Sequence, residues 1–133
     1  MYPNKFERSR LTSEDKLILE QFAIKRKLFD EFIKVRDLKI FTCPGCGYPT
    51  LGERGSYEIC DVCGWEDDNQ DDDSADEIWG GPNSNLSLTE NRLNIGRELK
   101  EIAESLNGAI NINCDEVFSA LKNSKWKSDL IKR

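Results

Sequence analysis

Hydrophobic residues recur at helical spacing over residues 12–39, a stretch without glycine or proline. The positions that fall near one stripe of a helix are Ile18, Phe22, Phe29, Phe32 and Ile33. Thr12 followed by Asp15 has the pattern of a capping box. The sequence therefore predicts a long N-terminal helix whose apolar face is buried against the chain or a partner. The basic cluster at residues 25–27 is expected on its solvated face.

Two further helices are predicted towards the C-terminus. Residues 87–107 begin with a Ser87/Glu90 capping box and end at Asn107-Gly108. The stripe of this second helix is Ile95, Leu99, Ile102 and Leu106. Residues 115–122 indicate a third, shorter helix, with Trp126 and Leu130 beyond it.

Residues 41–80 have a different pattern, in which glycine and proline are dense and apolar residues are few. FTCPGCGYPT and SYEICDVCGW predict short strands with a tight turn at each cysteine pair. Because this segment has too few apolar residues to form a core of its own, it needs a cross-link.

The cysteine spacing indicates that this cross-link is a metal ion. Cys43-x₂-Cys46 and Cys60-x₂-Cys63, thirteen residues apart, lie close to the spacing of a four-thiolate zinc site. Four sulfur ligands leave no open position at which the metal activates water, so the ion is expected to be structural. A redox pair and free thiols are weaker alternatives, and iron accepts the same ligands as zinc. Cys114 lies apart and is interpreted as a buried free cysteine.

Length and composition narrow the class of protein. The chain has 133 residues, five cysteines and no histidine. This length is that of one domain. An odd number of cysteines fits a disulfide framework poorly. The sequence shows no apolar signal region and no apolar stretch of membrane-spanning length, so a reducing cytoplasmic location is expected. The absence of histidine removes the commonest general base near neutral pH.

Negative charge is concentrated in the cysteine segment. Residues 41–78 carry one Arg and eleven acids, and EDDNQDDDSADE (66–77) holds eight of them. This balance argues against nucleic-acid binding and favours a basic protein partner. The expected partner surface consists of Asp67, Asp68, Asp71, Asp72, Asp73, Asp76, Glu77 and Trp79. Trp65 is expected to pack over the second cysteine turn, and Trp79 to cap the same module or, if exposed, to be a binding hot spot.

A calcium loop is the alternative for the acidic run. Asp67, Asn69, Asp71 and Asp73 can occupy its positions 1, 3, 5 and 7. However, Asp72 stands at the glycine position and Ile78 at that of the bidentate Glu, so the match fails twice.

The residues from CPGCGYPT to NRLN resemble the CPCC family of cysteine-rich bacterial proteins. The resemblance covers about residues 41–95 and includes both cysteine pairs, Tyr57-Glu58, Trp65-Glu66-Asp67-Asp68, Gln70, Gly80-Gly81, Asn83 and Ser87-Leu88. The family often reads Cys-Pro-Cys-Cys, whereas Gly45 takes the place of the middle cysteine here. The resemblance implies that Cys43, Cys46, Cys60 and Cys63 are the ligands. Its members' association with polymorphic toxin loci implies an immunity-type role.

Together these observations predict a single α+β domain, a small rubredoxin-like zinc ribbon with short β-strands, flanked by a long N-terminal helix and two C-terminal helices. Its parts are an N-terminal helical extension (1–40), a CPCC-type ribbon with an acidic loop (41–95) and a C-terminal helical part (96–133). The expected function is non-catalytic inhibition of a basic, nuclease-like bacterial toxin. The alternatives are a metal-dependent enzyme that uses the acidic loop for a divalent cation, and an adaptor that binds through its N-terminal helix.

Overall fold

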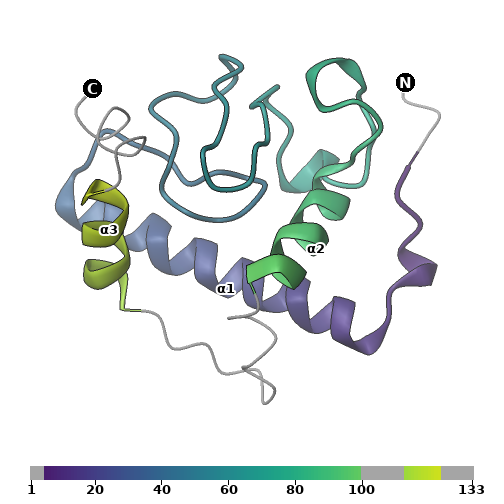
Figure 1. Cartoon of the computed structure of the whole chain (residues 1–133), viewed down its shortest axis with the longest axis horizontal. Helices are drawn as coiled ribbons and strands as arrows, with labels where there is room; N and C mark the ends of the chain where they lie inside the picture. The colour runs from purple at the N-terminus through teal and green to yellow at the C-terminus, as the bar shows by residue number, and fades with distance from the viewer. Residues whose placement is uncertain (1–4, 100–112, 124–133) are drawn as a thin grey trace.

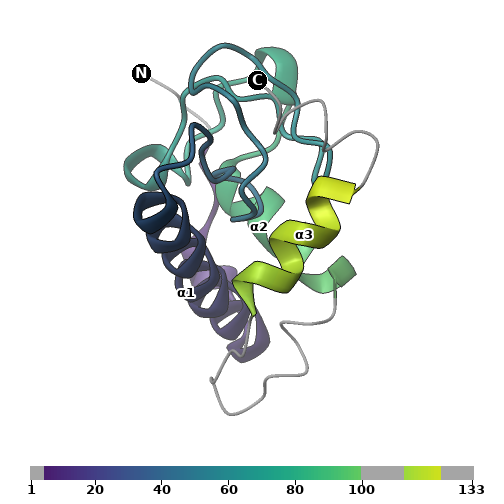
Figure 2. The ribbon, with the colours of Figure 1, turned by 90° about the vertical axis from the view of Figure 1, so that its left-hand side faces the viewer.

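The computed structural model describes residues 5–99 and 113–123, in which an irregular cysteine-rich segment lies on one side of three α-helices (Figures 1 and 2). The helices are α1 (Ser13–Arg36), α2 (Leu88–Leu99) and α3 (Cys114–Asn123). Three short 3₁₀ turns complete the elements: η1 (Arg8–Arg10), η2 (Asp72–Ser74) and η3 (Gly81–Asn83). None of the described helices combines the length and the apolar character that crossing a membrane requires.

Helix α1 lies within the range 12–39 expected from the sequence and begins at the expected capping box. The Asp15 N–H donates to Thr12 Oγ1 at 3.0 Å, and the Thr12 N–H donates to Asp15 Oδ2 at 3.1 Å. The helix ends at Arg36, and the next residue, Asp37, caps it with a left-handed φ of 52°. Ile18, Phe22 and Phe29 of its apolar stripe are buried within the protein. Little of that stripe is left for a partner, which weighs against an adaptor that binds through this helix.

The expectation that residues 25–27 form a solvated basic face is wrong for two of the three residues. Lys25 is fully buried, with Nζ 4.2 Å from the centroid of the Tyr48 ring. The Arg26 side chain is only 13% exposed, whereas Lys27 is exposed. The cysteine-rich segment covers the helix beside Phe22 and Phe29, and it covers the neighbouring basic residues as well.

The expected short β-strands are absent from the described part of the chain, where pairing is limited to isolated bridges. Within the cysteine-rich segment these are Phe41 with Leu51 and Ile59 with Glu66. After the Phe41–Leu51 bridge, a side-chain carboxylate accepts from the next backbone N–H groups. The N–H groups of Gly52 and Glu53 donate to Glu58. The ribbon prediction thus overstated the β content.

Helices α2 and α3 are both capped at their N-termini by side chains. Ser87 Oγ accepts from the Glu90 N–H at 3.0 Å, as the sequence predicted, and Asn113 Oδ1 accepts from the Glu116 N–H at 3.1 Å. Phe118 of α3 packs edge-on against Phe32 of α1, with ring centroids 5.2 Å apart. The remaining predicted positions lie outside the described residues: Ile102, Leu106, Asn107-Gly108, Trp126 and Leu130.

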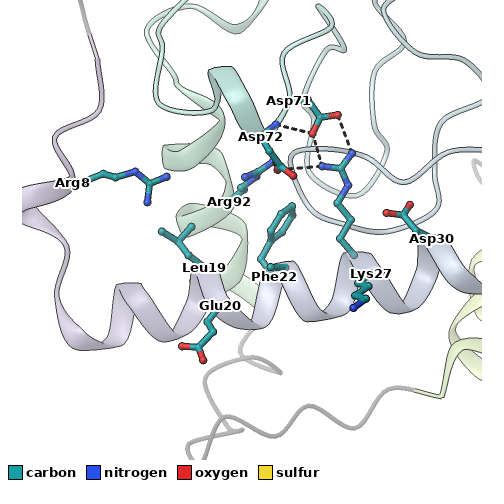
Figure 3. Close-up of a pocket in the computed structure, with 11 residues that line it drawn as sticks. Arg8, Leu19, Glu20, Phe22, Lys27, Asp30, Asp71, Asp72 and Arg92 are labelled. Carbon is teal, nitrogen blue, oxygen red and sulfur yellow. Dashed lines mark hydrogen bonds and ion pairs between the residues drawn. The ribbon is translucent and has the colours of Figure 1, made fainter.

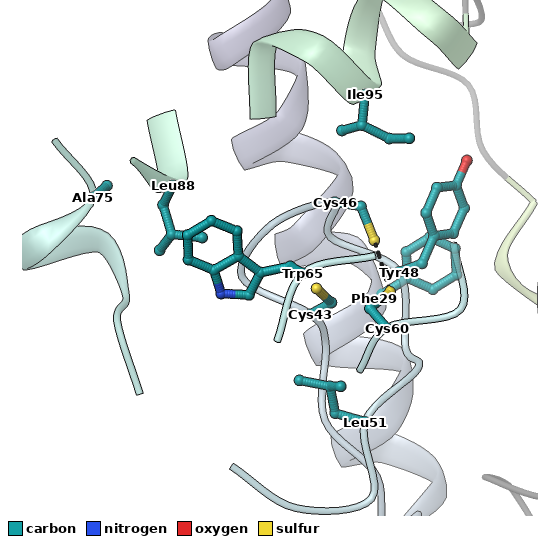
Figure 4. Close-up of a cluster of buried hydrophobic side chains, with 10 residues drawn as sticks. All are labelled: Phe29, Cys43, Cys46, Tyr48, Leu51, Cys60, Trp65, Ala75, Leu88 and Ile95. Carbon is teal, nitrogen blue, oxygen red and sulfur yellow. Dashed lines mark hydrogen bonds between the residues drawn. The ribbon is translucent and has the colours of Figure 1, made fainter. Parts of the chain in front are cut away.

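The core joins the helices to the cysteine-rich segment. Its buried members are Phe29, Cys43, Cys46, Tyr48, Leu51, Cys60, Trp65, Ala75, Leu88 and Ile95 (Figure 4). Trp65 is 1% exposed and lies between Leu88 and the cysteines, so its predicted burial is confirmed. Three of the cysteines therefore belong to the same core as residues of the helices. A change that displaces the sulfurs is expected to disturb the packing of the helices, and the reverse also holds.

Candidate metal centre

Two matched turns bring the four cysteines together. In the first turn the Gly47 N–H donates to the Cys43 carbonyl at 2.8 Å, and in the second the Gly64 N–H donates to the Cys60 carbonyl at 2.7 Å. Gly47 and Gly64 have φ values of 83° and 80°, a region that favours glycine. The glycine after each cysteine pair thus closes a turn that points both sulfurs to the same side.

The sulfur positions fit a tetrahedral ion. All four Sγ atoms lie within 4.8 Å of one another. The Sγ atoms of Cys43 and Cys63 are 3.7 Å apart, as are those of Cys46 and Cys60. A tetrahedron with zinc–sulfur bonds of about 2.3 Å has an edge of about 3.8 Å, whereas a disulfide needs about 2.05 Å. The predicted ligands Cys43, Cys46, Cys60 and Cys63 are therefore placed for metal binding and not for disulfides.

The four closely spaced thiols can all ionise only if a cation lies between them. Burial, followed by the neighbouring thiols, raises the pKa of Cys46 well above its ordinary value. Hydrogen bonds from Cys43 and Cys46 lower the pKa of Cys60. Four thiolates this close repel one another unless a positive ion lies between them, so metal binding and thiol ionisation are coupled. When bound, the ion supplies this charge and the cross-link between the two turns.

Neighbouring donors orient the sulfurs. The Gly45 N–H lies 3.3 Å from Cys43 Sγ, and Thr50 Oγ1 lies 3.1 Å from Cys60 Sγ. Donors of this kind stabilise ligating thiolates and fix their direction. The first cysteine turn is buried throughout, whereas Cys63 in the second is partly exposed. The cluster thus has a core side and a surface side.

The acidic tract folds partly inwards, onto arginines from four different segments. Asp67 is completely buried and accepts hydrogen bonds from Arg54 Nε at 2.8 Å and the Gly55 N–H at 2.7 Å. Asp71 accepts from both Nη atoms of Arg26 at 2.7 and 3.1 Å, and from Arg54 Nη1 at 2.7 Å. Burial opposes the ionisation of Asp71, but the hydrogen bonds from Arg26 and Arg54 outweigh it and hold its pKa well below the usual range.

The eight residues of the expected partner surface therefore differ in exposure. Asp72 and Asp73 are exposed, Asp67 is buried, and Asp68, Asp71, Asp76, Glu77 and Trp79 are half-buried. Asp76 is paired with Arg8 Nε and accepts from Thr89 Oγ1, and Glu77 accepts from Trp79 Nε1 at 3.0 Å. The carboxylates that face solvent are concentrated at η2.

Sequence reasoning missed four partners of the acidic tract: Arg8, Arg26, Arg54 and Arg92. Arg92 of α2 donates to Asp72 at 2.8 Å, so all four arginines neutralise acids counted as surface charge. Arg54 was the one visible signal, because it is the sole base among residues 41–78. Arg26 and Arg92 reach the tract only through the packing of their helices, which a charge count along the chain does not show.

The alternative of a second cation in the acidic loop gains no support from the geometry. Within residues 5–99 and 113–123, the four cysteines are the only group of three or more thiols or carboxylates whose ligand atoms converge. Cys114 lies outside this group, half-buried against the core. Burial, with a smaller effect from Asp115, raises the pKa of its thiol.

Gly45, the departure from the Cys-Pro-Cys-Cys pattern, occupies a position without room for a side chain. A Cβ there would lie 2.6 Å from Asn91 Nδ2, 3.1 Å from Trp65 Cβ and 3.2 Å from Cys63 Sγ. The same Asn91 amide donates to the Gly45 carbonyl at 3.1 Å. The small residue therefore lets α2 approach the first cysteine turn.

We expect Gly45→Ala to lower the free energy of unfolding of the zinc-loaded protein by about 1–3 kcal/mol, because the added methyl group overpacks this contact. Urea unfolding in the presence of zinc measures the change. Asn91→Ala removes the closest atom, so the double variant should lose less stability than the sum of the two single variants. Strictly additive losses would contradict the assigned contact.

Comparison with known proteins supports the resemblance inferred from the sequence. The model of the cysteine-rich CPCC family matches residues 41–98, so the resemblance is confirmed over this segment, and its four-cysteine cluster fits a zinc-ribbon-like site. No curated protein and no solved structure matches the chain.

Proposed function

We propose that this CPCC-type chain is a non-catalytic protein-interaction module whose cysteine-rich segment is held in a rubredoxin-like ribbon arrangement by one structural zinc ion. The observation that carries the proposal is the closed set of four converging sulfurs. With every coordination position filled by protein sulfur, no position remains for a substrate or an activated water. The ion's contribution is then to the stability of the fold, which fits a segment with few apolar residues of its own.

The proposed binding surface is the acidic turn at η2, and the proposed partner is a basic protein in the cytoplasm. Asp72 and Asp73 are exposed there, beside the half-buried Asp71. Dense negative charge steers association with cationic proteins and raises the association rate at low salt. The concrete form is an immunity-type inhibitor of a nuclease-like bacterial toxin, because such enzymes present cationic clefts for nucleic acid. The toxin-locus association of the resembling family adds to this choice.

The experiment uses the protein encoded next to this chain in its genome as the binding partner. Association rate constants are measured by biolayer interferometry at low and physiological salt for the zinc-loaded chain. The double variant Asp72→Asn/Asp73→Asn should slow association several-fold at low salt, with a smaller effect at higher salt. Asp67 and Asp71 are left intact because their carboxylates are buried or half-buried, whereas the Asp72 side chain is 74% exposed despite its ion pair with Arg92.

The matched control is Glu14→Gln/Glu31→Gln, which removes the same charge from exposed positions on α1. This variant should bind at nearly the wild-type rate. Equal slowing of both double variants would show that net charge and not the η2 surface matters. A neighbour that does not bind the wild-type chain would contradict the inhibitor role.

A further inference from the structure

Helix α2 contacts the first cysteine turn through two consecutive side chains. Asn91 Nδ2 donates to the Gly45 carbonyl at 3.1 Å, and Arg92 Nε donates to the Pro44 carbonyl at 2.8 Å. Pro44 and Gly45 are the two residues between the ligands Cys43 and Cys46. Coordination of both cysteines fixes the path of this short turn and so fixes the two carbonyls that α2 binds.

The other end of the Arg92 side chain binds the acidic turn. Its Nη2 donates to Asp72 Oδ1 at 2.8 Å, and its guanidinium lies 4.2 Å from the centroid of the Phe22 ring (Figure 3). The Arg92 side chain is 8% exposed, whereas that of Asp72 is 74% exposed. One buried guanidinium thus joins the metal-binding turn, α1 and a carboxylate at the surface.

Burial makes both of these hydrogen bonds important to Arg92. Loss of solvent lowers the pKa of Arg92, and the charge of Asp72 and its hydrogen bond oppose this effect. A buried cation that loses an acceptor is strongly disfavoured and moves to regain one. If Asp72 no longer binds Nη2, the guanidinium shifts, and its Nε bond to the Pro44 carbonyl weakens. If the first turn relaxes, the restraint on Asp72 is lost.

We propose that Arg92 is a positioning residue that couples metal binding at the cysteine cluster to the acidic turn at η2 through Asp72. Metal binding stabilises the Arg92-bound position of Asp72, and the ion pair with Asp72 in turn strengthens metal retention, since such a coupling is reciprocal. Asp72 therefore affects the metal although it is not a ligand. Binding at η2 is then sensitive to metal loading. The coupling itself does not depend on the proposed partner.

The test compares two adjacent exposed acids in the full-length, zinc-loaded protein. Asp72→Asn and Asp73→Asn remove the same charge from the same turn, but the ion pair with Arg92 is made by Asp72. Zinc release to excess EDTA is followed with a chromogenic zinc indicator. Asp72→Asn should accelerate release by about fivefold or more, the lower end of typical couplings, whereas Asp73→Asn should stay within about twofold of wild type.

A second readout separates positioning from a general loss of stability. In the cadmium-loaded protein the ¹¹³Cd resonance reports the geometry of the sulfurs around the metal. It should shift in Asp72→Asn and remain in place in Asp73→Asn. In an Arg92→Met background, Asp72→Asn should add no further acceleration of release, because the connecting side chain is gone.

Equal release rates for the two Asn variants would overturn the proposal, as would an unchanged cadmium resonance in Asp72→Asn. These outcomes differ from a failure of the proposed function. Metal release and the cadmium resonance are measured without a partner, so an absent toxin partner leaves the coupling intact, and a missing coupling leaves partner binding untouched.

Discussion

Cys60→Ser is expected to unfold the cysteine-rich segment and to destabilise the helices packed against it. Structural zinc binding of this type contributes on the order of 10 kcal/mol to folding, and loss of one of four thiolate ligands removes much of it. Cys60 is 1% exposed and belongs to the core that contains Trp65 and Leu88. The variant should therefore lose the cooperative thermal transition of the zinc-loaded wild type, and removing the metal from the wild type with a chelator should have the same effect.

Cys114→Ser is the matched control, because it makes the same chemical change at a half-buried thiol outside the cluster. Its melting temperature should stay close to that of the wild type, as is usual for a change away from a metal site. Circular dichroism and calorimetry measure both variants. Equal melting behaviour of Cys60→Ser and the wild type would contradict a structural role for the ion.

Asp67→Asn is expected to lower the free energy of unfolding by about 3–5 kcal/mol, the range found when one partner of a buried ion pair is removed. The Asp67 side chain is 0% exposed and binds Arg54 Nε at 2.8 Å. It also accepts from the backbone N–H groups of Gly55 and Asn69. An amide in place of the carboxylate presents a donor to these donors and leaves Arg54 with less compensation. Urea unfolding at saturating zinc measures the loss.

Asp73→Asn provides the comparison, since Asp73 belongs to the same tract but is exposed. Its effect on stability should lie within about 0.5 kcal/mol. A similar small effect for Asp67→Asn would mean that Asp67 is a surface charge after all. The pair of variants thus separates acids that hold the fold from acids available to a partner.

The convergence of the four cysteines could be predicted from the sequence because the determinants of its two turns are local. Two Cys-x₂-Cys pairs, each followed by a glycine, specify the turns almost independently of the rest of the chain. The capping box at Thr12 and the Ser87 cap of α2 are equally local: both bonds of the first are present, and Ser87 Oγ accepts from the Glu90 N–H. Within each turn and each cap the interacting residues lie within about five positions of one another, so spacing alone predicts the contact.

The acidic tract was harder to interpret because the arginines that pair with its carboxylates are distant in sequence. Arg26 and Asp71 are separated by 45 residues, and Arg92 lies 48 residues from the Pro44 carbonyl that it binds. A run of acids looks like a solvated surface until the packing of α1 and α2 brings arginines to it. The two stretches expected to form strands pair only through the isolated bridges Phe41–Leu51 and Ile59–Glu66, and the N–H groups of Gly52 and Gly55 between them donate to the carboxylates of Glu58 and Asp67.

The most direct test of this account is elemental analysis of the purified full-length chain under reducing conditions. Inductively coupled plasma mass spectrometry should find about one zinc ion per chain, as a single four-thiolate site requires. The zinc should be lost when Cys43 or Cys60 is replaced and retained when Cys114 is replaced. A wild-type chain that is folded, reduced and free of stoichiometric transition metal would contradict the account.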